Sequence, residues 1–451
     1  MAPTVVVTRH VFWSCRASLR VESVCARPSV AGVWRYCHGL CALLLQLGTS
    51  QWFGSLAYGE LIDGPTQPFQ EKDLRSPSIC FLALTAYPVL AGLRDSQELG
   101  GAQVQQAMLA RALVKAGIDV SMICMDYGQP AYETIDGIRV IRSYAPTAGV
   151  RGLRTLHPRL TSVWRALSLA NADVVYQRCA GVNTAIAVAW AKRHRRASIY
   201  AVASDLDLQE GVPIVPGARD KRVFTWGLRG ADAVVLQNPR QQELLQEVHG
   251  RLGQLIPSCY AADGSRVAAA ANDEVLWVGM LRPVKRPDRF LALARALPHR
   301  RFRMIGGPCG DSPETQQYFD AIARDAESIP NLEFMGFVPF RDVDPWFARA
   351  AVFVNTSEHE GFPNTFLQAW SRGLPTVALF DTGSRQNGQA PYRLVQTDAQ
   401  LPQAVEQLLT DAAIWQQASD LCHAYFEAHH APAGAASAYR QLMLRLVRGA
   451  S

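Results

Sequence analysis

The chain has 451 residues, which is too long for one ordinary hydrophobic core and is typical of two domains. Hydrophobic residues make up 49% and charged residues 19%, a composition that indicates a globular protein and excludes a disordered one. The net charge of +6 is too small to indicate nucleic-acid binding by itself. The chain contains no run of 18 apolar residues, so the sequence predicts no transmembrane helix. The ten cysteines form no Cys-x-x-Cys pair, so they favour a reducing compartment over a zinc site or a disulfide framework.

Residues 1–76 carry little hydrophobic periodicity, several turn residues and four of the ten cysteines. We expect a poorly patterned N-terminal extension here, and not a domain. The alternative is an amphipathic, membrane-contacting segment at about 34–53.

A strand, a glycine loop, a helix and a second strand follow in order. The apolar run at 78–84 predicts a buried strand, Gly100 and Gly101 open a helix, and 118–125 predicts the next strand. A glycine loop before a helix lets the backbone approach a ligand and points free N–H groups at an anion, although a plain turn is the alternative. The fingerprints of dinucleotide-binding and P-loop proteins are absent, which disfavours a dehydrogenase or a P-loop nucleotidase.

An arginine-rich stretch without any acidic residue lies between Asp136 and Asp173. Such a stretch predicts either a surface for anionic lipids or a solvated basic face. Binding of nucleic acid is disfavoured, because few aromatic residues interleave with the arginines. The arginines are Arg139, Arg142, Arg151, Arg154, Arg159 and Arg165.

Polar residues follow several further strand predictions in the first half of the chain. Tyr176 and Arg178 end one apolar run, Asp205 follows the next, and Asn238 follows a third. Ligands bind beyond the carboxyl ends of parallel strands, so these residues are candidates for a binding crevice. The alternative for each is a loop polar group satisfied by its neighbours.

The second half opens with a strand at 274–279 that ends in Gly279. A basic loop with Arg282 and Lys285 follows, and Pro287 begins a helix. Cations at this place suit a reaction in which a leaving group gains negative charge. Further on, Gly336 and Phe337 follow the strand predicted at 332–335.

The central stretch of the second half is Ser357 to Val377. It begins after an apolar strand, makes a loop with Glu358 and Glu360, continues as a helix from about Asn364, and returns as a strand. This βαβ unit places Glu360 where an open α/β sheet binds ligands. Gln368 follows eight residues later in the early turns of the helix, and we expect its side chain to face the same crevice.

This stretch resembles the signature of the retaining nucleotide-sugar glycosyltransferases of family 4. Their signature has two glutamates eight residues apart, with Gly-Phe after the first. Glu360, Gly361 and Phe362 match it, whereas Gln368 replaces the second glutamate. The family's Gly-Arg-Leu-x-x-x-Lys pattern is matched by Gly279 and Lys285, with Met280 in place of the arginine and Arg282 two residues away.

The resemblance covers roughly Ser78 to the C-terminus and implies an α/β protein of GT-B fold. Two Rossmann-like domains would face each other across a cleft. It assigns 77–260 to an acceptor domain, 261–273 to a linker, 274–430 to a nucleotide-sugar domain, and 431–451 to a C-terminal helix that crosses back to the first domain.

The same resemblance implies roles for individual residues. Glu360, Lys285 and Arg282 would be catalytic. Donor binding would involve Gly279, Gly336, Phe337, Glu358, Gly361, Phe362, Pro363, Asn364, Thr365 and Gln368. Of these, the backbone of the Gly336–Phe337 loop would contact the nucleotide base, and Gln368 would take the ribose-contacting role of the missing glutamate. The acceptor side would involve Gly100, Gly101, Gln103, Arg178 and Asp205.

The expected function is retaining hexosyl transfer from a UDP- or GDP-sugar to a glycan or lipid-linked acceptor, in the synthesis of cell-surface polysaccharide. We expect no cofactor and no bound metal, because no Asp-x-Asp motif ends a strand of the second domain, although Asp205-Leu206-Asp207 occurs in the first. The expected location is the cytoplasm, at the inner face of the membrane. The alternatives are a non-catalytic sugar-nucleotide-binding scaffold and another GT-B activity, such as a nucleotide-sugar epimerase.

Overall fold

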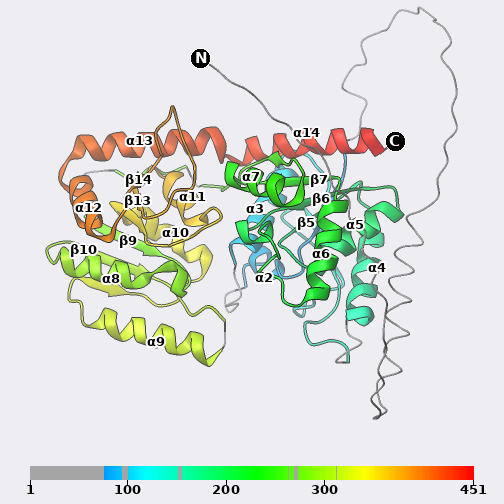
Figure 1. The fold of residues 1–451 in the computed structure, drawn as a ribbon, viewed down its shortest axis with the longest axis horizontal. Helices are drawn as coiled ribbons and strands as arrows, with labels where there is room; N and C mark the ends of the chain where they lie inside the picture. Colours follow the sequence, from blue (N-terminus) through cyan, green and yellow to red (C-terminus); the bar gives the residue numbers. More distant parts are fainter. Residues whose placement is uncertain are drawn as a thin grey trace, which may run out of the picture. The chain divides into compact units, whose positions relative to one another are not determined.

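Strands and helices alternate along this chain and build two separate sheets (Figure 1). The computed structural model describes residues 76–93, 100–150, 155–262, 264–268, 273–310 and 312–450. The extension predicted at 1–76 therefore lies, except for Ser76, outside the described residues.

The first sheet has eight strands in the order β3-β4-β2-β1-β5-β6-β7-β8, and only the β3–β4 pair is antiparallel. Its strands are β1 (Ile79–Leu82), β2 (Val120–Cys124), β3 (Tyr132–Ile135), β4 (Ile138–Arg142), β5 (Val174–Arg178), β6 (Ala197–Ala201), β7 (Ala233–Leu236) and β8 (Gln254–Leu255). Its helices are α2 (Tyr87–Leu90), α3 (Gly101–Lys115), α4 (Thr161–Ala170), α5 (Val182–Arg193), α6 (Ala218–Gly230) and α7 (Pro239–His249).

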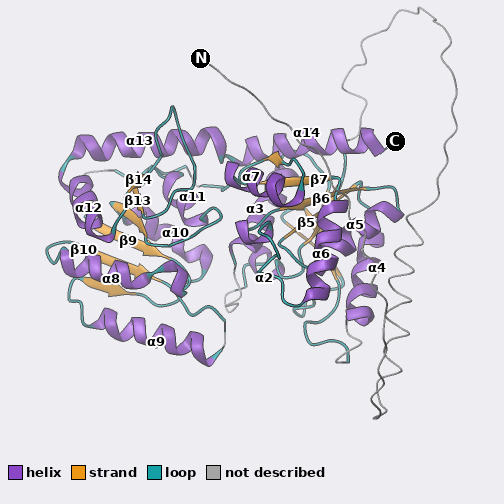
Figure 2. Ribbon diagram, in the orientation of Figure 1, coloured by secondary structure: helices purple, strands orange, loops and turns teal. Residues whose placement is uncertain are grey.

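The second sheet has six strands in the order β11-β10-β9-β12-β13-β14, all parallel. Its strands are β9 (Glu274–Val278), β10 (Arg301–Ile305), β11 (Leu332–Phe334), β12 (Val352–Asn355), β13 (Thr376–Ala378) and β14 (Arg393–Leu394). Its helices are α8 (Pro287–Ala296), α9 (Pro313–Glu327), α10 (Phe340–Arg349), α11 (Asn364–Trp370), α12 (Leu401–Thr410) and α13 (Ala412–His429). Helices accompany the strands of both sheets (Figure 2).

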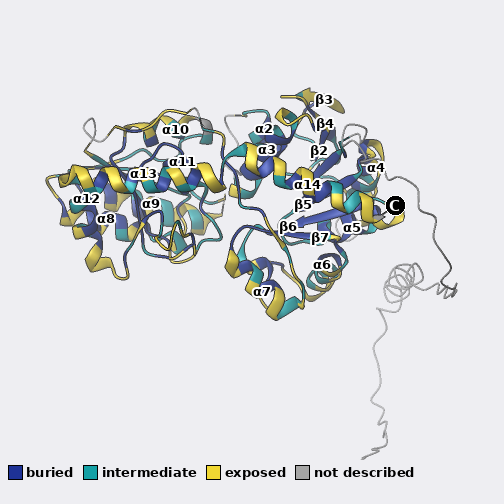
Figure 3. Cartoon of the chain, turned by 90° about the horizontal axis from the view of Figure 1, so that it is seen from above, coloured by how far each residue is buried: buried dark blue, intermediate teal, exposed yellow. Residues whose placement is uncertain are grey.

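The apolar runs of the sequence form the buried strands of the two sheets. Strands β1, β2, β6 and β12 are buried along their whole length, as expected for parallel strands covered on both faces. In Figure 3 strands such as β2 and β6 are dark blue, whereas the outer side of helix α13 is largely yellow. The two sheets therefore have the continuous apolar cores predicted from the sequence.

The hairpin β3–β4 is an element that the sequence analysis missed. Its turn consists of Asp136 and Gly137, which have φ angles of 51° and 78°. An Asp-Gly pair between alternating apolar residues is the strongest short-range hairpin signal, because both turn positions need a positive φ. Arg139 and Arg142 of the arginine-rich stretch thus lie on β4, next to the edge strand β3 of the first sheet.

The last helix, α14 (Pro432–Ala450), packs against α3 and β6 of the first sheet. Its buried residues Ala436, Tyr439 and Met443 recur at helical spacing and belong to the core around β1. The last helix thus belongs to the core of the first domain. No helix in the described ranges combines the length and apolar character needed to cross a membrane.

Candidate functional site

The second sheet contains a topological switch point between β9 and β12. From β9 the chain proceeds to β10 and β11 on one side, and it then returns to place β12 on the other side. Crevices for ligands form at the carboxyl ends of strands where the strand order reverses. Two loops meet at this point, residues 279–286 after β9 and residues 356–363 after β12.

Lys285 and Glu360 come together between these loops. The Lys285 ammonium donates to Glu360 Oε1, and the Ser357 hydroxyl donates to the same oxygen at 2.8 Å. The two charged side chains are 23% and 13% exposed, so the pair is largely shielded but still open to solvent. A carboxylate and an ammonium 75 residues apart in sequence therefore share one small site.

A network of hydrogen bonds fixes the backbone around this pair. The Trp277 indole donates to Thr356 Oγ1 at 2.9 Å, and the Thr356 hydroxyl donates to the carbonyl of Lys285 at 2.8 Å. The backbone N–H of Glu358 donates to the carbonyl of Val284 at 2.9 Å. These bonds tie the loop of Lys285 to that of Glu360. Trp277 was not predicted as a site residue, because an indole inside an apolar strand is expected to belong to the hydrophobic core.

The other charged residues of the two loops differ in position. Arg282 is exposed, and the structure does not bring it to the Lys285–Glu360 pair. Arg286 instead donates to Glu358 at 2.8 Å and to Asp288. The hydrogen bonds to Asp288 and to Glu358 raise the pKa of the Arg286 guanidinium. Arg286 was not among the predicted site residues, and its charge is balanced by its two partners.

Glycines at the ends of β9, β10 and β11 allow the neighbouring loops to lie close together. The Gly306 N–H donates to the Gly336 carbonyl at 2.9 Å, and the Leu281 N–H donates to the Gly307 carbonyl at 2.8 Å. A Cβ on Gly307 would lie 2.8 Å from Cδ2 of Phe337, so a larger residue would push that ring away. The predicted donor-binding residues Gly279, Gly336 and Phe337 thus lie in adjoining loops.

The start of α11 contacts the first domain. The Asn364 amide donates to the Gly101 carbonyl at 3.1 Å and accepts from the Gln105 amide at 2.9 Å. Asn238 donates to the Gly361 carbonyl at 3.1 Å. Asn364 thus connects α11 with α3, and donor binding by this residue stays a prediction.

The residues flanking Asn364 have different surroundings. Pro363 is buried, and Thr365 is half-buried. The Phe362 ring packs on the His430 ring, with centroids 4.8 Å apart.

Gln368 differs from its expected orientation. We predicted that its side chain points into the crevice, but it is only 2% exposed. Its amide nitrogen donates to Asp344 Oδ1 of α10 at 2.8 Å. The apolar neighbours Phe366, Leu367 and Trp370 hold α11 against the core, and Gln368 is buried with them.

The first sheet has its own switch point, between β1 and β5. Gly100 caps α3, and the Gln103 amide donates to Thr85 Oγ1 at 2.9 Å in the loop after β1. Arg178 ends β5 and lies beside a small cavity that Tyr439 of α14 also lines. The predicted Gly100, Gly101, Gln103 and Arg178 therefore lie at the carboxyl ends of these two central strands.

Asp205 lies in the loop after β6 and accepts from the Gln241 amide at 3.0 Å. Burial raises the pKa of its carboxyl group, while hydrogen bonds from Gln241 and Asn238 and the nearby His359 partly oppose that effect. His359 directly precedes Glu360. A Cβ on Gly361 would lie 3.4 Å from the Cα of Ser204, so the residues just before Asp205 lie against the Glu360 loop.

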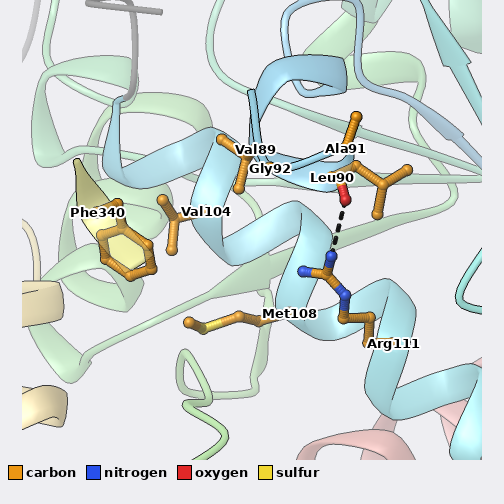
Figure 4. A pocket seen from close by; sticks show the side chains of 8 residues that line it. All are labelled: Val89, Leu90, Ala91, Gly92, Val104, Met108, Arg111 and Phe340. Carbon is orange, nitrogen blue, oxygen red and sulfur yellow. Dashed lines mark hydrogen bonds between the residues drawn. The ribbon is translucent and has the colours of Figure 1, made fainter. Parts of the chain in front are cut away.

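The larger of the two cavities described lies elsewhere. It has a volume of about 290 Å³ and is lined by α2, by α3 and by Phe340 of α10 (Figure 4). Arg111 is its one charged lining residue, and its guanidinium already donates to the Leu90 carbonyl at 2.9 Å. Because its other lining is mostly apolar, this cavity lacks the paired charges found at Lys285 and Glu360.

His430 lies buried behind the Glu360 loop. One ring nitrogen, Nδ1, is 2.7 Å from the Ser258 carbonyl and must donate to it. Nε2 has no hydrogen-bond partner among the described residues and faces aromatic neighbours such as Phe362 and Trp370. Burial, the largest cause, lowers the pKa of His430 to about 4, and the Ser258 carbonyl only partly opposes it.

We expect this histidine to make stability depend on pH. An unfolded histidine has a pKa near 6.5, so below this value the unfolded state binds the proton more readily and stability falls. The free energy of unfolding should be about 2 kcal/mol lower at pH 4.5 than at pH 7 because of this histidine. Urea unfolding of the wild type and of His430→Gln at both pH values measures it. Equal losses in both proteins would show that His430 does not titrate in this way.

Comparison with known proteins gives consistent matches to both domains. Residues 272–411 match the family model described as "Glycosyl transferases group 1", and residues 100–257 match that of the "Glycosyl transferase 4-like domain". A D-inositol 3-phosphate glycosyltransferase of Frankia alni is 31% identical over 122 residues. That match covers 25% of this chain and only 30% of the relative.

Solved structures resemble the whole described fold. A sucrose-phosphate synthase from Thermosynechococcus elongatus has a TM-score of 0.66 at 19% identity, covering 83% of this chain and 100% of that one. The Anabaena protein HepE, solved with UDP and glucose, has a TM-score of 0.61 at 15% identity, covering 82% of this chain and 100% of that one. At these identities the likeness shows the fold, which is GT-B.

Proposed function

We propose that this chain, which belongs to the family 4 glycosyltransferases of GT-B fold, moves a hexosyl group from a nucleotide sugar to a glycan or lipid-linked acceptor. The observation that carries the proposal is the contact of Lys285 with Glu360 at the switch point of the second sheet. Both residues lie within the range matched by the first family model.

The chemistry of the two side chains suits such a donor. As the bond between sugar and diphosphate breaks, negative charge grows on the leaving phosphate, and Lys285 can neutralise it. A carboxylate accepts hydrogen bonds only, so Glu360 can hold a pair of sugar hydroxyls. Ser357 donates to Glu360 Oε1 and so fixes the orientation of that carboxylate.

The donor is proposed to be a UDP- or GDP-sugar. HepE, which shares the fold, was solved with UDP and glucose, and this supports a nucleotide of that kind. Retention of configuration and transfer without a bound metal come from the family resemblance. An excess of EDTA is therefore expected to leave turnover unchanged.

A panel of UDP- and GDP-sugars tests the proposal. The protein is incubated with each sugar, with and without lipid-linked and glycan acceptors, and free nucleotide is measured. Release that depends on one donor supports transfer.

The replacement of the family's arginine by Met280 and of its second glutamate by Gln368 favours a non-catalytic relative as the second candidate. Nucleotide binding without release would support that candidate. Conversion of one nucleotide sugar into another would support an epimerase.

A lipid-linked acceptor would place the enzyme in the cytoplasm at the inner face of the membrane. The arginine-rich stretch was predicted to be either a surface for anionic lipid or a solvated basic face. In the structure Arg139, Arg142 and Arg159 each donate to a main-chain carbonyl, and Arg165 is exposed. Arg151 and Arg154 lie outside the described residues. The engaged arginines keep their charge but are less free to reach lipid headgroups.

We expect flotation with vesicles that contain anionic lipid, and weaker flotation at high salt. Each exposed cation near such a surface contributes about 1 kcal/mol. Arg165→Gln should therefore lower the partition coefficient about fivefold. Equal flotation with neutral vesicles, or none with either, would contradict an electrostatic contact.

A further inference from the structure

Gln368 occupies the position of the family's second glutamate. In the structure this glutamine forms a hydrogen bond that a glutamate could not form. The Gln368 amide nitrogen donates to Asp344 Oδ1 at 2.8 Å. A glutamate carboxylate has no proton to donate and would face Asp344 as a like charge. Gln368 and Asp344 are therefore complementary, and a carboxylate is still present at this place.

Asp344 closes a buried polar cluster. The Tyr260 hydroxyl donates to Asp344 Oδ1 at 2.6 Å, and Arg372 lies 3.5 Å from Oδ2. Tyr260, Gln368 and Arg372 are each at most 2% exposed, but the Asp344 side chain is 31% exposed. The buried partners hold the carboxylate, while part of it remains open to solvent.

The Tyr260 hydroxyl keeps its proton in this cluster. Burial is the main cause that raises its pKa, and the negative charge of Asp344 adds to the effect. The phenol therefore donates to Asp344 over the whole range of working pH. This hydrogen bond fixes the position of the carboxylate.

Asp344 and its partner Gln368 lie on two helices that each follow one part of the proposed donor site. Asp344 lies on α10, which begins just after the loop of Gly336 and Phe337. Its partner Gln368 lies on α11, which begins just after the loop of Glu360. In the family resemblance the first loop contacts the nucleotide base, and the second holds the sugar. In a nucleotide sugar the ribose lies between the base and the diphosphate sugar.

We propose that Asp344, held by Gln368 and Tyr260, accepts hydrogen bonds from the ribose hydroxyls of the donor nucleotide in place of the missing glutamate. This inference rests on the proposed function, because it requires a nucleotide in the second domain. The competing interpretation is that Asp344 only holds Tyr260, the last residue before the predicted linker, against α10. Only the first interpretation predicts that loss of the Asp344 carboxylate weakens binding through the ribose hydroxyls of the nucleotide.

Calorimetric titration with UDP, GDP and ADP first identifies the nucleotide that the wild type binds best. That nucleotide and its 2′,3′-dideoxy analogue are then titrated into Asp344→Asn. We expect at least tenfold weaker binding of the ribonucleotide, but less than a twofold change for the analogue, which lacks both hydroxyls. Asp320→Asn is the matched control, because it makes the same change on the exposed part of α9.

Three results would overturn the inference. Unchanged binding of the ribonucleotide by Asp344→Asn would exclude the contact. Equal weakening for both nucleotides would show that Asp344 acts only on the fold. If the wild type binds none of the three nucleotides, the proposed function itself fails, and the inference fails with it.

A charge exchange provides an independent test. Gln368→Glu should weaken nucleotide binding at least tenfold and lower the unfolding temperature, because two carboxylates then meet beside buried Tyr260. The double variant Gln368→Glu/Asp344→Asn restores one carboxylate and one amide. We expect it to recover binding to within threefold of the wild type. If the double variant is no better than Gln368→Glu alone, the two residues are not complementary in the way proposed.

Discussion

Glu360→Gln is expected to reduce kcat by about 10³ while the protein stays folded. Glutamine has nearly the same shape, and its carbonyl can still accept from Ser357. It has only one acceptor oxygen and no charge, so it cannot hold two sugar hydroxyls as a carboxylate does. It also leaves the Lys285 ammonium without its counter-ion. Steady-state kinetics with the donor identified by the panel measures the effect.

The matched control for this variant is Glu327→Gln. Glu327 is exposed at the end of α9 in the same domain, so the same chemical change there should alter kcat less than twofold. The unfolding temperature of both variants should stay close to that of the wild type. A Glu360→Gln enzyme with wild-type kcat would remove Glu360 from the catalytic site.

Lys285→Ala is the second substitution with a large expected effect. The ammonium contacts Glu360 in the structure, and it is only 23% exposed, so its charge is poorly screened. In the proposed reaction its interaction strengthens as the diphosphate departs. We expect kcat to fall by about 10² to 10³, as for loss of one preorganised donor. Lys285→Arg keeps the charge and should retain more activity.

Lys115→Ala is the control here, because Lys115 is exposed at the end of α3. Its kcat should match that of the wild type. If Lys285→Ala raises KM and leaves kcat unchanged, Lys285 binds the donor equally in the ground and transition states. Wild-type kcat and KM together would place Lys285 outside the site.

Local patterns were sufficient to predict most of the fold. Apolar runs predicted the central strands of both sheets, and the strand–loop–helix–strand unit around Glu360 was predicted because each of its parts has a local signal. Gly373, with a φ of 65°, follows the end of α11, where a glycine can adopt the positive φ that stops a helix. The hairpin at Asp136 and Gly137 could have been found from its turn residues.

The contacts of the site could not be predicted in the same way. Lys285 meets Glu360 because β9 and β12 are neighbours, and strand order is not encoded in any local pattern. The partner of Gln368 is Asp344, from a helix that the sequence analysis did not identify. Arg282 and Arg286 look equivalent in sequence, but only Arg286 is paired with the acids of the site.

A crystal structure with the best-binding nucleoside diphosphate tests the central claim most directly. We expect the nucleotide to lie between the loops 279–286 and 356–363, with a phosphate oxygen about 2.8 Å from the Lys285 ammonium. The base should lie beside Gly336 and Phe337. A nucleotide bound in the apolar cavity at Val104 and Met108, or one that leaves Lys285 paired only with Glu360, would contradict the account.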